Sequence, residues 1–223
     1  MACTLRFERR LVRSGYGLIA GADEVGRGAV AGPVVAAAVI LDHKHVPRGI
    51  NDSKQLTRLQ REELAGEIRK HAVAVSIARV EHFEIDQINI LRASLRAMEL
   101  AIKALRPLPD YALIDGHKTV PDLACPQSTI VKGDCLSVTV AAASIIAKVA
   151  RDQWMKEYDE RYPGYGFGSH AGYNTRAHQE AIARLGPSAI HRLTFRGVLF
   201  SQPSLDFGAS EDASPLSSLP NRT

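Results

Sequence analysis

The chain of 223 residues predicts an α/β fold in which a sheet carries acidic residues at the ends of its strands. Short apolar runs of strand character alternate with longer segments whose apolar residues recur at helical spacing. Two of the apolar runs lead directly into carboxylates and glycines. The 45% hydrophobic content is enough for one sizeable core. One main domain is therefore expected over residues 1–200.

The first apolar run, residues 18–20, leads into two adjacent acids, Asp23 and Glu24. Side chains alternate between the faces of a regular strand, so the pair indicates a strand end, where both can approach one point. Two close carboxylates repel each other unless a cation lies between them, and oxygen ligands suit Mg²⁺ or Mn²⁺. The stretch predicts a metal site. The alternative is a solvated acidic turn.

The glycines that follow the acids suggest a second role for this stretch. Gly26 and Gly28 have no Cβ, so backbone N–H groups could come close to a phosphate. The charged guanidinium group of Arg27 would add a further contact. Residues 26–32 also approximate a dinucleotide-binding fingerprint. That motif must open a helix, whereas this one leads to Pro33 and an apolar run.

Residues 34–41 are continuously apolar and predict a strand that is covered on both faces. The preceding loop is too short for a crossover helix, so this strand should pair antiparallel with the first. A helix is expected over residues 58–70, with Thr57 as N-cap and Gln60 completing a capping box. Lys54, in the polar cluster before that helix, is a candidate phosphate contact.

Residues 72–80 predict a third strand, and the spacing of apolar residues predicts one long amphipathic helix over residues 85–105. Residues 111–114 then form a short apolar run that ends at Asp115 and Gly116, repeating the pattern of the first strand. If the two strands lie side by side and parallel, their acids emerge at one edge, where open α/β sheets bind ligands.

A last strand is expected at residues 127–131 and a helix at residues 136–158. Asp134 lies just before that helix and is either its N-cap or a further metal ligand. Along the helix, one polar stripe on an otherwise apolar surface could lie along a substrate backbone. Its members are Ser144, Lys148 and Arg151.

Residues 162–173 form a glycine-rich aromatic loop before a helix at residues 175–185. Its rings either stack on a base or sugar or anchor the loop. His170 and His178 are candidate polar contacts or supporting groups. Residues 201–223 are rich in Ser, Pro, Asp and Asn and are expected to be a disordered tail.

The formal net charge of +4 and a pI of about 9.0 make a nucleic-acid partner plausible. Three cysteines without zinc-ligand spacing indicate neither a disulfide framework nor a zinc site. No signal peptide or apolar stretch of membrane-spanning length is recognised. We therefore expect a cytoplasmic protein that is not in a membrane.

Five blocks in this order closely resemble bacterial ribonuclease HII, a type 2 ribonuclease H, and the resemblance covers about residues 15 to 195. Chance agreement across all five is not credible. The blocks are DEVGRG at 23–28, NDSK at 51–54, IDG at 114–116, KGD at 132–134 and AASIIAKVARD at 142–152.

The resemblance implies a ribonuclease H-like fold, with a mixed five-stranded sheet, three antiparallel strands first, flanking helices and a small C-terminal helical part. It implies four acids that bind Mg²⁺ or Mn²⁺, two ions with substrate bound: Asp23, Glu24, Asp115 and Asp134. It also implies recognition of the ribonucleotide at an RNA–DNA junction by four residues: Gly26, Arg27, Gly28 and Tyr173. Three further residues could position phosphates: Lys54, Ser144 and Lys148.

Family membership implies an endoribonuclease that cuts RNA in RNA–DNA hybrids and nicks duplex DNA on the 5′ side of an embedded ribonucleotide. The products would carry 5′-phosphate and 3′-hydroxyl ends, as ribonucleotide excision repair requires. A monomer is expected. Two residues depart from the family pattern near Tyr173: Ala171 replaces a lysine and Asn174 a glycine, which bears on the backbone contacts of that loop.

Two other readings remain beside the family expectation. A nucleic-acid-binding module without catalysis would fit the basic pI, but it gives no reason for four acids at separate strand and helix ends. A nuclease from another branch of the same fold is the closer competitor. Cleavage of a duplex with one ribonucleotide discriminates between these readings.

Overall fold

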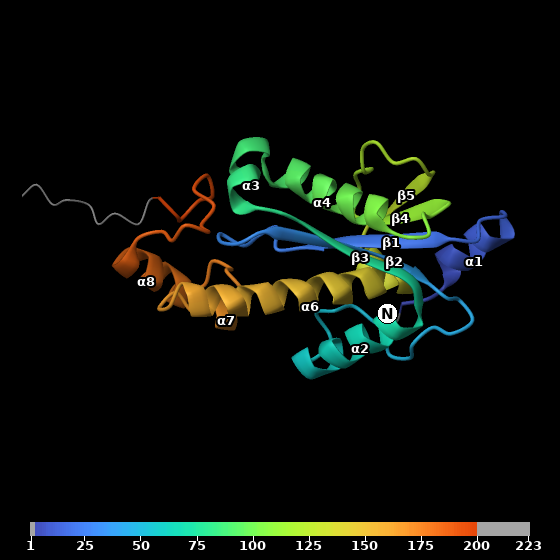
Figure 1. Cartoon of the computed structure of the whole chain (residues 1–223), viewed down its shortest axis with the longest axis horizontal. Coiled ribbons are helices and arrows are strands. Elements are labelled where there is room, and N and C mark those ends of the chain that lie inside the picture. Colours follow the sequence, from blue (N-terminus) through green and yellow to red (C-terminus); the bar gives the residue numbers. More distant parts are fainter. Residues whose placement is uncertain (1–2, 200–223) are drawn as a thin grey trace, which may run out of the picture.

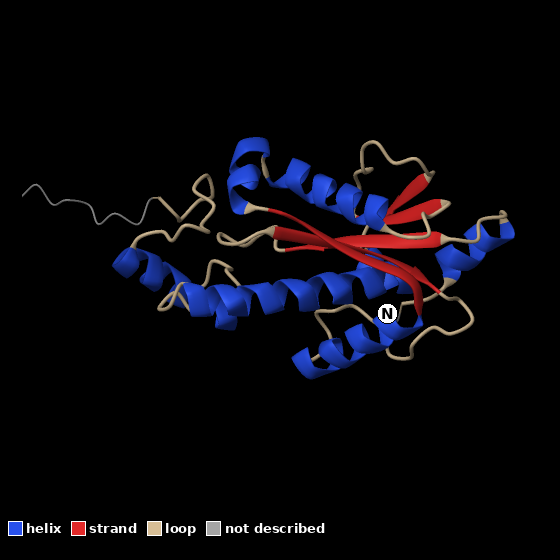
Figure 2. Ribbon diagram, in the orientation of Figure 1, coloured by secondary structure: helices blue, strands red, loops and turns tan. Residues whose placement is uncertain are grey.

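The computed structural model describes residues 3–199 and is built on a mixed sheet with helices on both faces (Figures 1 and 2). The strand order is β3-β2-β1-β4-β5. The strands are β1 (Ile19–Val25), β2 (Val34–Leu41), β3 (Ala72–Val80), β4 (Tyr111–Asp115) and β5 (Gln127–Ile130). The predicted five-stranded sheet is therefore confirmed.

The pairing of the strands follows the sequence expectation. β1 pairs antiparallel with β2, and β2 antiparallel with β3. β4 lies on the other side of β1 and is parallel to it, as β5 is to β4. Every residue of β2 is buried, because β2 lies between two strands and under helices on both faces. The parallel pair β1 and β4 brings two acid-bearing strand ends to the same edge.

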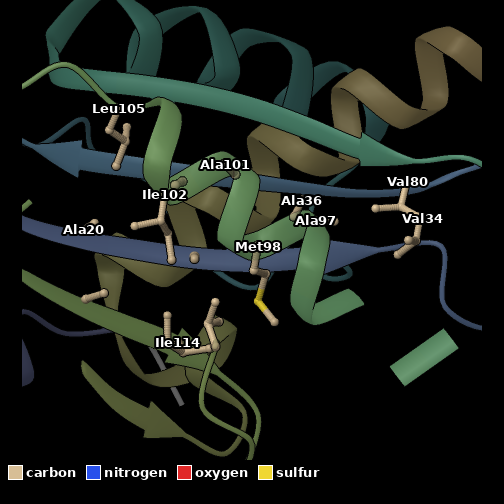
Figure 3. Close-up of a cluster of buried hydrophobic side chains, with 14 of the residues drawn as sticks. Ala20, Val34, Ala36, Val80, Ala97, Met98, Ala101, Ile102, Leu105 and Ile114 are labelled. Carbon is tan, nitrogen blue, oxygen red and sulfur yellow. The ribbon is translucent and has the colours of Figure 1, made fainter. Parts of the chain in front are cut away.

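Helices cover both faces of this sheet. The helices of the described residues are α1 (Arg6–Arg13), α2 (Arg58–His71), α3 (His82–Ile88), α4 (Ile90–Ala104), α5 (Gly133–Leu136), α6 (Val138–Arg161), α7 (Phe167–His170) and α8 (Arg176–Leu185). α4 packs on one face through residues such as Met98 and Ile102, which point toward the sheet in Figure 3. α2 and α6 pack on the opposite face. The capping box predicted for α2 is confirmed, since Thr57 and Gln60 exchange both hydrogen bonds.

Two predicted helices are each divided in the structure. The helix expected over residues 85–105 breaks at Asn89, which adopts a φ of 69° and caps α4 by accepting from the N–H groups of Leu91 and Arg92. Asparagine tolerates this left-handed conformation better than most residues, so it can end one helix and begin the next.

The helix expected from residue 136 is divided at Ser137, which is the N-cap of α6. Asp134 lies in the first turn of the short α5, so its reading as an N-cap was wrong. Its side chain caps neither helix and instead accepts a hydrogen bond from Lys54 Nζ.

α6 packs very closely on β1. One residue of β1 and one residue of α1 account for this position of α6. A Cβ on Gly21 would lie 2.4 Å from the backbone carbon of Thr139, so only glycine allows this approach. Glu8 of α1 is fully buried and accepts hydrogen bonds from Ser137 Oγ and the Thr139 N–H at the start of α6. A carboxylate there also complements the positive end of the helix dipole. Gly21 thereby allows α6 to approach β1, and Glu8 attaches the start of α6 to α1.

The C-terminal helical part consists of α7, α8 and the segment that follows, and it packs beside the far end of α6 (Figure 1). None of the helices formed by residues 3–199 has the length and apolar character needed to cross a membrane. The tail predicted for residues 201–223 lies outside the described residues.

Candidate active site

A cleft of about 460 Å³ opens where β1 and β4 end beside α6. It is lined by eleven of the residues that the sequence analysis proposed for metal or substrate binding. They come from the end of β1 and the loop after it, from the loop before α2, and from β4, α5, α6 and the segment after α7. They are Asp23, Glu24, Gly26, Arg27, Gly28, Lys54, Asp115, Asp134, Ser144, Lys148 and Tyr173.

The adjacent acids lie near the end of β1, as the sequence predicted, but both still belong to the strand. Asp23 and Glu24 pair with β2 as ordinary strand residues. The register of β1 with β4, however, stops at Ala22, and the edge of β1 is open from there on. Both neighbouring side chains can reach one point around this open edge. Carboxylate oxygens of Asp23, Glu24 and Asp115 all lie within 4.8 Å of one another.

The carboxylates of this group repel one another. Burial raises the pKa of Asp23 well above its usual value, and the charges of Glu24 and Asp115 raise it further. Burial also raises the pKa of Glu24, against the effect of Arg27, whose Nη1 lies 3.0 Å from Glu24 Oε1. The pKa of Asp115 is raised by burial and then by the charge of Asp134. A cation between the acids would relieve these repulsions.

Asp134 lines the same cleft as this group, and the start of its helix contacts Asp115. The N–H of Gly133 donates to Asp115 Oδ1 over 2.7 Å, which attaches the start of α5 to the end of β4. Lys54 Nζ lies 2.9 Å from Asp134 Oδ2. This hydrogen bond raises the pKa of Lys54 to about 12, so the lysine is charged.

A second group of possible ligand atoms, from Asp52, Asp134 and Cys135, also lies within 4.8 Å. Burial raises the pKa of the Cys135 thiol to about 12, and its S–H lies 3.5 Å from Asp52 Oδ2. A protonated thiol is a poor ligand for Mg²⁺ or Mn²⁺, which prefer oxygen. The group built only of carboxylates therefore fits such ions better.

The loop between β1 and β2, residues 26–33, is called the glycine loop here. Gly26 has a φ of 92°, and a Cβ on it would lie 2.2 Å from Nε of Arg151. Arg151 is fully buried and donates to the carbonyl groups of Ala31 and Pro33. The suggestion that Arg151 contacts substrate was therefore wrong. A second buried arginine, Arg192, donates to carbonyl groups of the same loop.

Residues 171–174, called the tyrosine loop, pair with the glycine loop. Gly172 O accepts from the N–H of Val30 at 2.9 Å, and Arg151 Nη1 donates to Ala171 O at 2.8 Å. The Arg151 guanidinium lies 5.5 Å from the centre of the Tyr173 ring. The loop therefore keeps its backbone contacts with alanine at position 171, although Ala171 has a φ of 48°. A Cβ on Gly28 would be 3.9 Å from the Tyr173 ring, so the glycine leaves space beside it.

A hydrogen bond from α8 supports the tyrosine loop. His178 Nδ1 lies 2.9 Å from Tyr173 O and must donate to it. His178 Nε2 is then an acceptor for His191 Nε2, 3.1 Å away, while His191 Nδ1 accepts from the Ser188 N–H. Burial lowers the pKa of His191 to about 4, so the His191 imidazole is neutral in this hydrogen-bonded chain. His178 is thus a supporting group, one of the two roles considered for it.

Two residues that sequence reasoning missed also line the cleft with polar groups: Ser53 and Arg61. Ser53 Oγ lies 3.1 Å from Ser144 Oγ, and Arg61 Nη1 donates to the carbonyl groups of Ser53 and Leu56. Ser53 lies within the NDSK block, which was a usable signal. Arg61 looked like any surface arginine of a helix, because only the packing of α2 on α6 directs it to the cleft.

Comparisons with known proteins identify the family of this chain. The Ribonuclease HII family model matches residues 20–198. Ribonuclease HII of Geobacter sulfurreducens is 55% identical over 192 residues, covering 86% of this chain and 88% of the relative. Ribonuclease HII of Nitrosococcus oceani is 57% identical over 180 residues, covering 81% and 89%.

Solved structures share the fold. Ribonuclease H2 of Pyrococcus horikoshii superposes with a TM-score of 0.69 at 28% identity, covering 82% of this chain and 95% of that one. RNase HII of Archaeoglobus fulgidus, solved in complex with PCNA, gives 0.70 at 28% identity and covers 85% and 99%. The ribonuclease H-like fold is confirmed. The chain belongs to the ribonuclease HII family of endoribonucleases.

Proposed function

We propose that this ribonuclease H uses Mg²⁺ or Mn²⁺ to cut the RNA of RNA–DNA hybrids and to nick duplex DNA on the 5′ side of an embedded ribonucleotide. The observation that supports it is the convergence of four acids from β1, β4 and α5 in one cleft with cationic side chains around them. The three carboxylates within 4.8 Å offer the oxygen donors that such ions prefer. A bound pair of ions would supply Lewis-acid stabilisation of the charge that develops during phosphodiester hydrolysis.

The residues around the acids would bind and orient the scissile phosphate. Lys54, Lys148 and Ser144 line the cleft beside the acids and can donate to phosphate oxygens. These contacts fix the register of the strand without reading its bases. In-line attack would then leave a 5′-phosphate on the ribonucleotide and a 3′-hydroxyl on its neighbour. Cleavage independent of sequence is the expected consequence.

Recognition of the ribose would fall to the glycine loop and the tyrosine loop. The 2′-OH is the group that distinguishes a ribonucleotide from its DNA neighbours. Gly28 and Tyr173 face each other, and the absence of a side chain on Gly28 leaves room for a sugar beside the ring. The two buried arginines and the backbone pairing of the loops support the walls of this space.

The decisive experiment is incubation of the protein with a labelled duplex that carries one ribonucleotide, in the presence of Mn²⁺ or Mg²⁺. We expect a single nick on the 5′ side of the ribonucleotide, a 3′ end that a DNA polymerase can extend, and no cut in an all-DNA duplex. Asp23→Asn should abolish the nick. Tight binding without any cut would favour a binding module instead.

A role in ribonucleotide excision repair, a cytoplasmic location and a monomeric state belong to the same proposal. The repair role depends on nicking at single ribonucleotides, so the experiment above tests it directly. Sedimentation of the purified chain tests the monomer.

A further inference from the structure

A groove of about 280 Å³ continues from the cleft and shares Arg61, Lys148 and Tyr173 with it. Its walls are α2 on one side, α6 at the base, and α7 with the tyrosine loop on the other. In Figure 1 the helices α2 and α6 lie on the same side of the sheet, and α7 lies beside α6. The groove contains none of the four acids, so the metal site does not account for it.

Cationic side chains dominate this groove. Arg58, Arg61, Lys148 and Lys156 line it, whereas Asp152 is its only acidic lining residue. Asp152 is 2.7 Å from Lys148 Nζ. Glu62, next to the groove, is 2.9 Å from Arg58 Nε and 3.8 Å from Lys156 Nζ. The four cations exceed these two anions, so the groove is positively charged on balance.

The spacing along α6 suits a repeating anion. Ser144, Lys148, Asp152 and Lys156 follow one another at intervals of four residues, so each side chain lies next to the following one on a stripe that winds slowly around the helix. At 1.5 Å per residue this stripe is about 18 Å long, from the cleft to the far end of the groove. A duplex advances by about 3.4 Å per base pair, so the stripe accompanies about five base pairs.

We propose that this groove binds the sugar–phosphate backbone of the substrate duplex beyond the cleft, with Arg58 and Lys156 contacting phosphates that the acids never reach. The proposal rests on the proposed function, because it takes the same duplex as ligand. Arg61 would join the two parts, since it lines both and its guanidinium is held by two carbonyl groups. Such contacts add affinity without sequence preference.

The test compares the double variant Arg58→Gln, Lys156→Gln with a matched control, Arg96→Gln, Lys103→Gln. The control residues are on α4, which packs on the opposite face of the sheet. Arg96 is as exposed as Arg58, at 55% against 58%, and both arginines form ion pairs of 2.9 Å. Lys103 is likewise paired with a glutamate.

Binding of the ribonucleotide-containing duplex is measured by fluorescence anisotropy at several salt concentrations, with Asp23→Asn added to every protein to prevent cutting. The groove variant should lower the slope of log affinity against log salt by about 1.8, at about 0.9 per lost phosphate contact. Its affinity near physiological salt should fall about three- to tenfold. In the otherwise wild-type protein, KM should rise while kcat stays unchanged, because the lost contacts are made equally before and during the reaction.

A groove variant whose slope, affinity and KM match those of the α4 control would overturn the proposal. Thermal unfolding of both variants checks that each is folded, which the exposure of these side chains favours. The proposed function fails separately, if the unmodified protein does not nick the duplex although the groove variant still changes the salt dependence of binding.

Discussion

The ammonium group of Lys54 lies 2.9 Å from Oδ2 of Asp134, although 80 residues separate the two in the chain. The lysine side chain is 78% exposed, whereas that of Asp134 is 7% exposed. An exposed cation from the loop before α2 thus pairs with a buried carboxylate of the cleft. A divalent ion that binds Asp134 must compete with this contact.

We expect Lys54→Gln to bind Mn²⁺ more tightly than the unmodified protein does when no substrate is present. The variant loses a positive charge that repels the ion and a partner that occupies Asp134. Activity should nonetheless fall by about ten- to a hundredfold, because a charge-assisted contact to the phosphate is lost. Calorimetric titration with Mn²⁺ and cleavage rates at saturating metal check the two effects. Weaker metal binding would show that Lys54 supports the site rather than competes for it.

The stability of the metal-free protein should depend on the charge of Asp23. Because burial and neighbouring carboxylates raise the pKa of Asp23, the folded state binds its proton more tightly than the unfolded chain. This stabilisation is complete below about pH 4 and is lost as the pH rises through the folded-state pKa.

Asp23→Asn should therefore melt at a higher temperature than the unmodified protein in EDTA, and the difference in melting temperature should grow as the pH rises from about 4 to 7. Adding Mg²⁺ or Mn²⁺ should stabilise the unmodified protein and reduce the difference. Thermal melts across this range provide the measurement. A difference that is constant with pH would contradict the assignment of this repulsion to Asp23.

Gly26→Ala should destabilise the protein and inactivate it, because the new Cβ would meet Arg151 Nε at 2.2 Å and displace both loops. Gly15→Ala is a matched control, since Gly15 has a φ of 95° but open space around its Cβ position. The control should cost about 1–2 kcal/mol from backbone strain alone and keep its activity. Chemical denaturation and cleavage assays compare the two. Equal costs and equal activity would mean that Arg151 moves aside freely.

Tyr173→Ala should lower nicking at a single ribonucleotide by about ten- to a hundredfold, as expected for the loss of a stacking ring. Tyr173→Phe keeps the ring and the contact with Arg151, so most of the activity should remain. Initial rates on the same duplex give the comparison. If the phenylalanine variant is as impaired as the alanine variant, the hydroxyl rather than the ring recognises the substrate.

Sequence alone determined the elements whose signals are local. The apolar run of β2 and the capping box of α2 depend on residues close together in the chain. The family blocks likewise identified the residues that meet in the cleft. Each of these signals is short, because hydrogen-bonding patterns and side-chain periodicity repeat within a few residues.

Only the tertiary structure decided the burial of Arg151 and the direction of Arg61. Arg151 reads as part of a polar stripe on α6, yet the loops it binds come from residues about 20 and 120 positions away. A buried arginine is stable only when its donors meet carbonyl groups, and those partners exist only once the loops have packed around it. The groove beside the cleft also depends on this packing, because its cations come from separate helices.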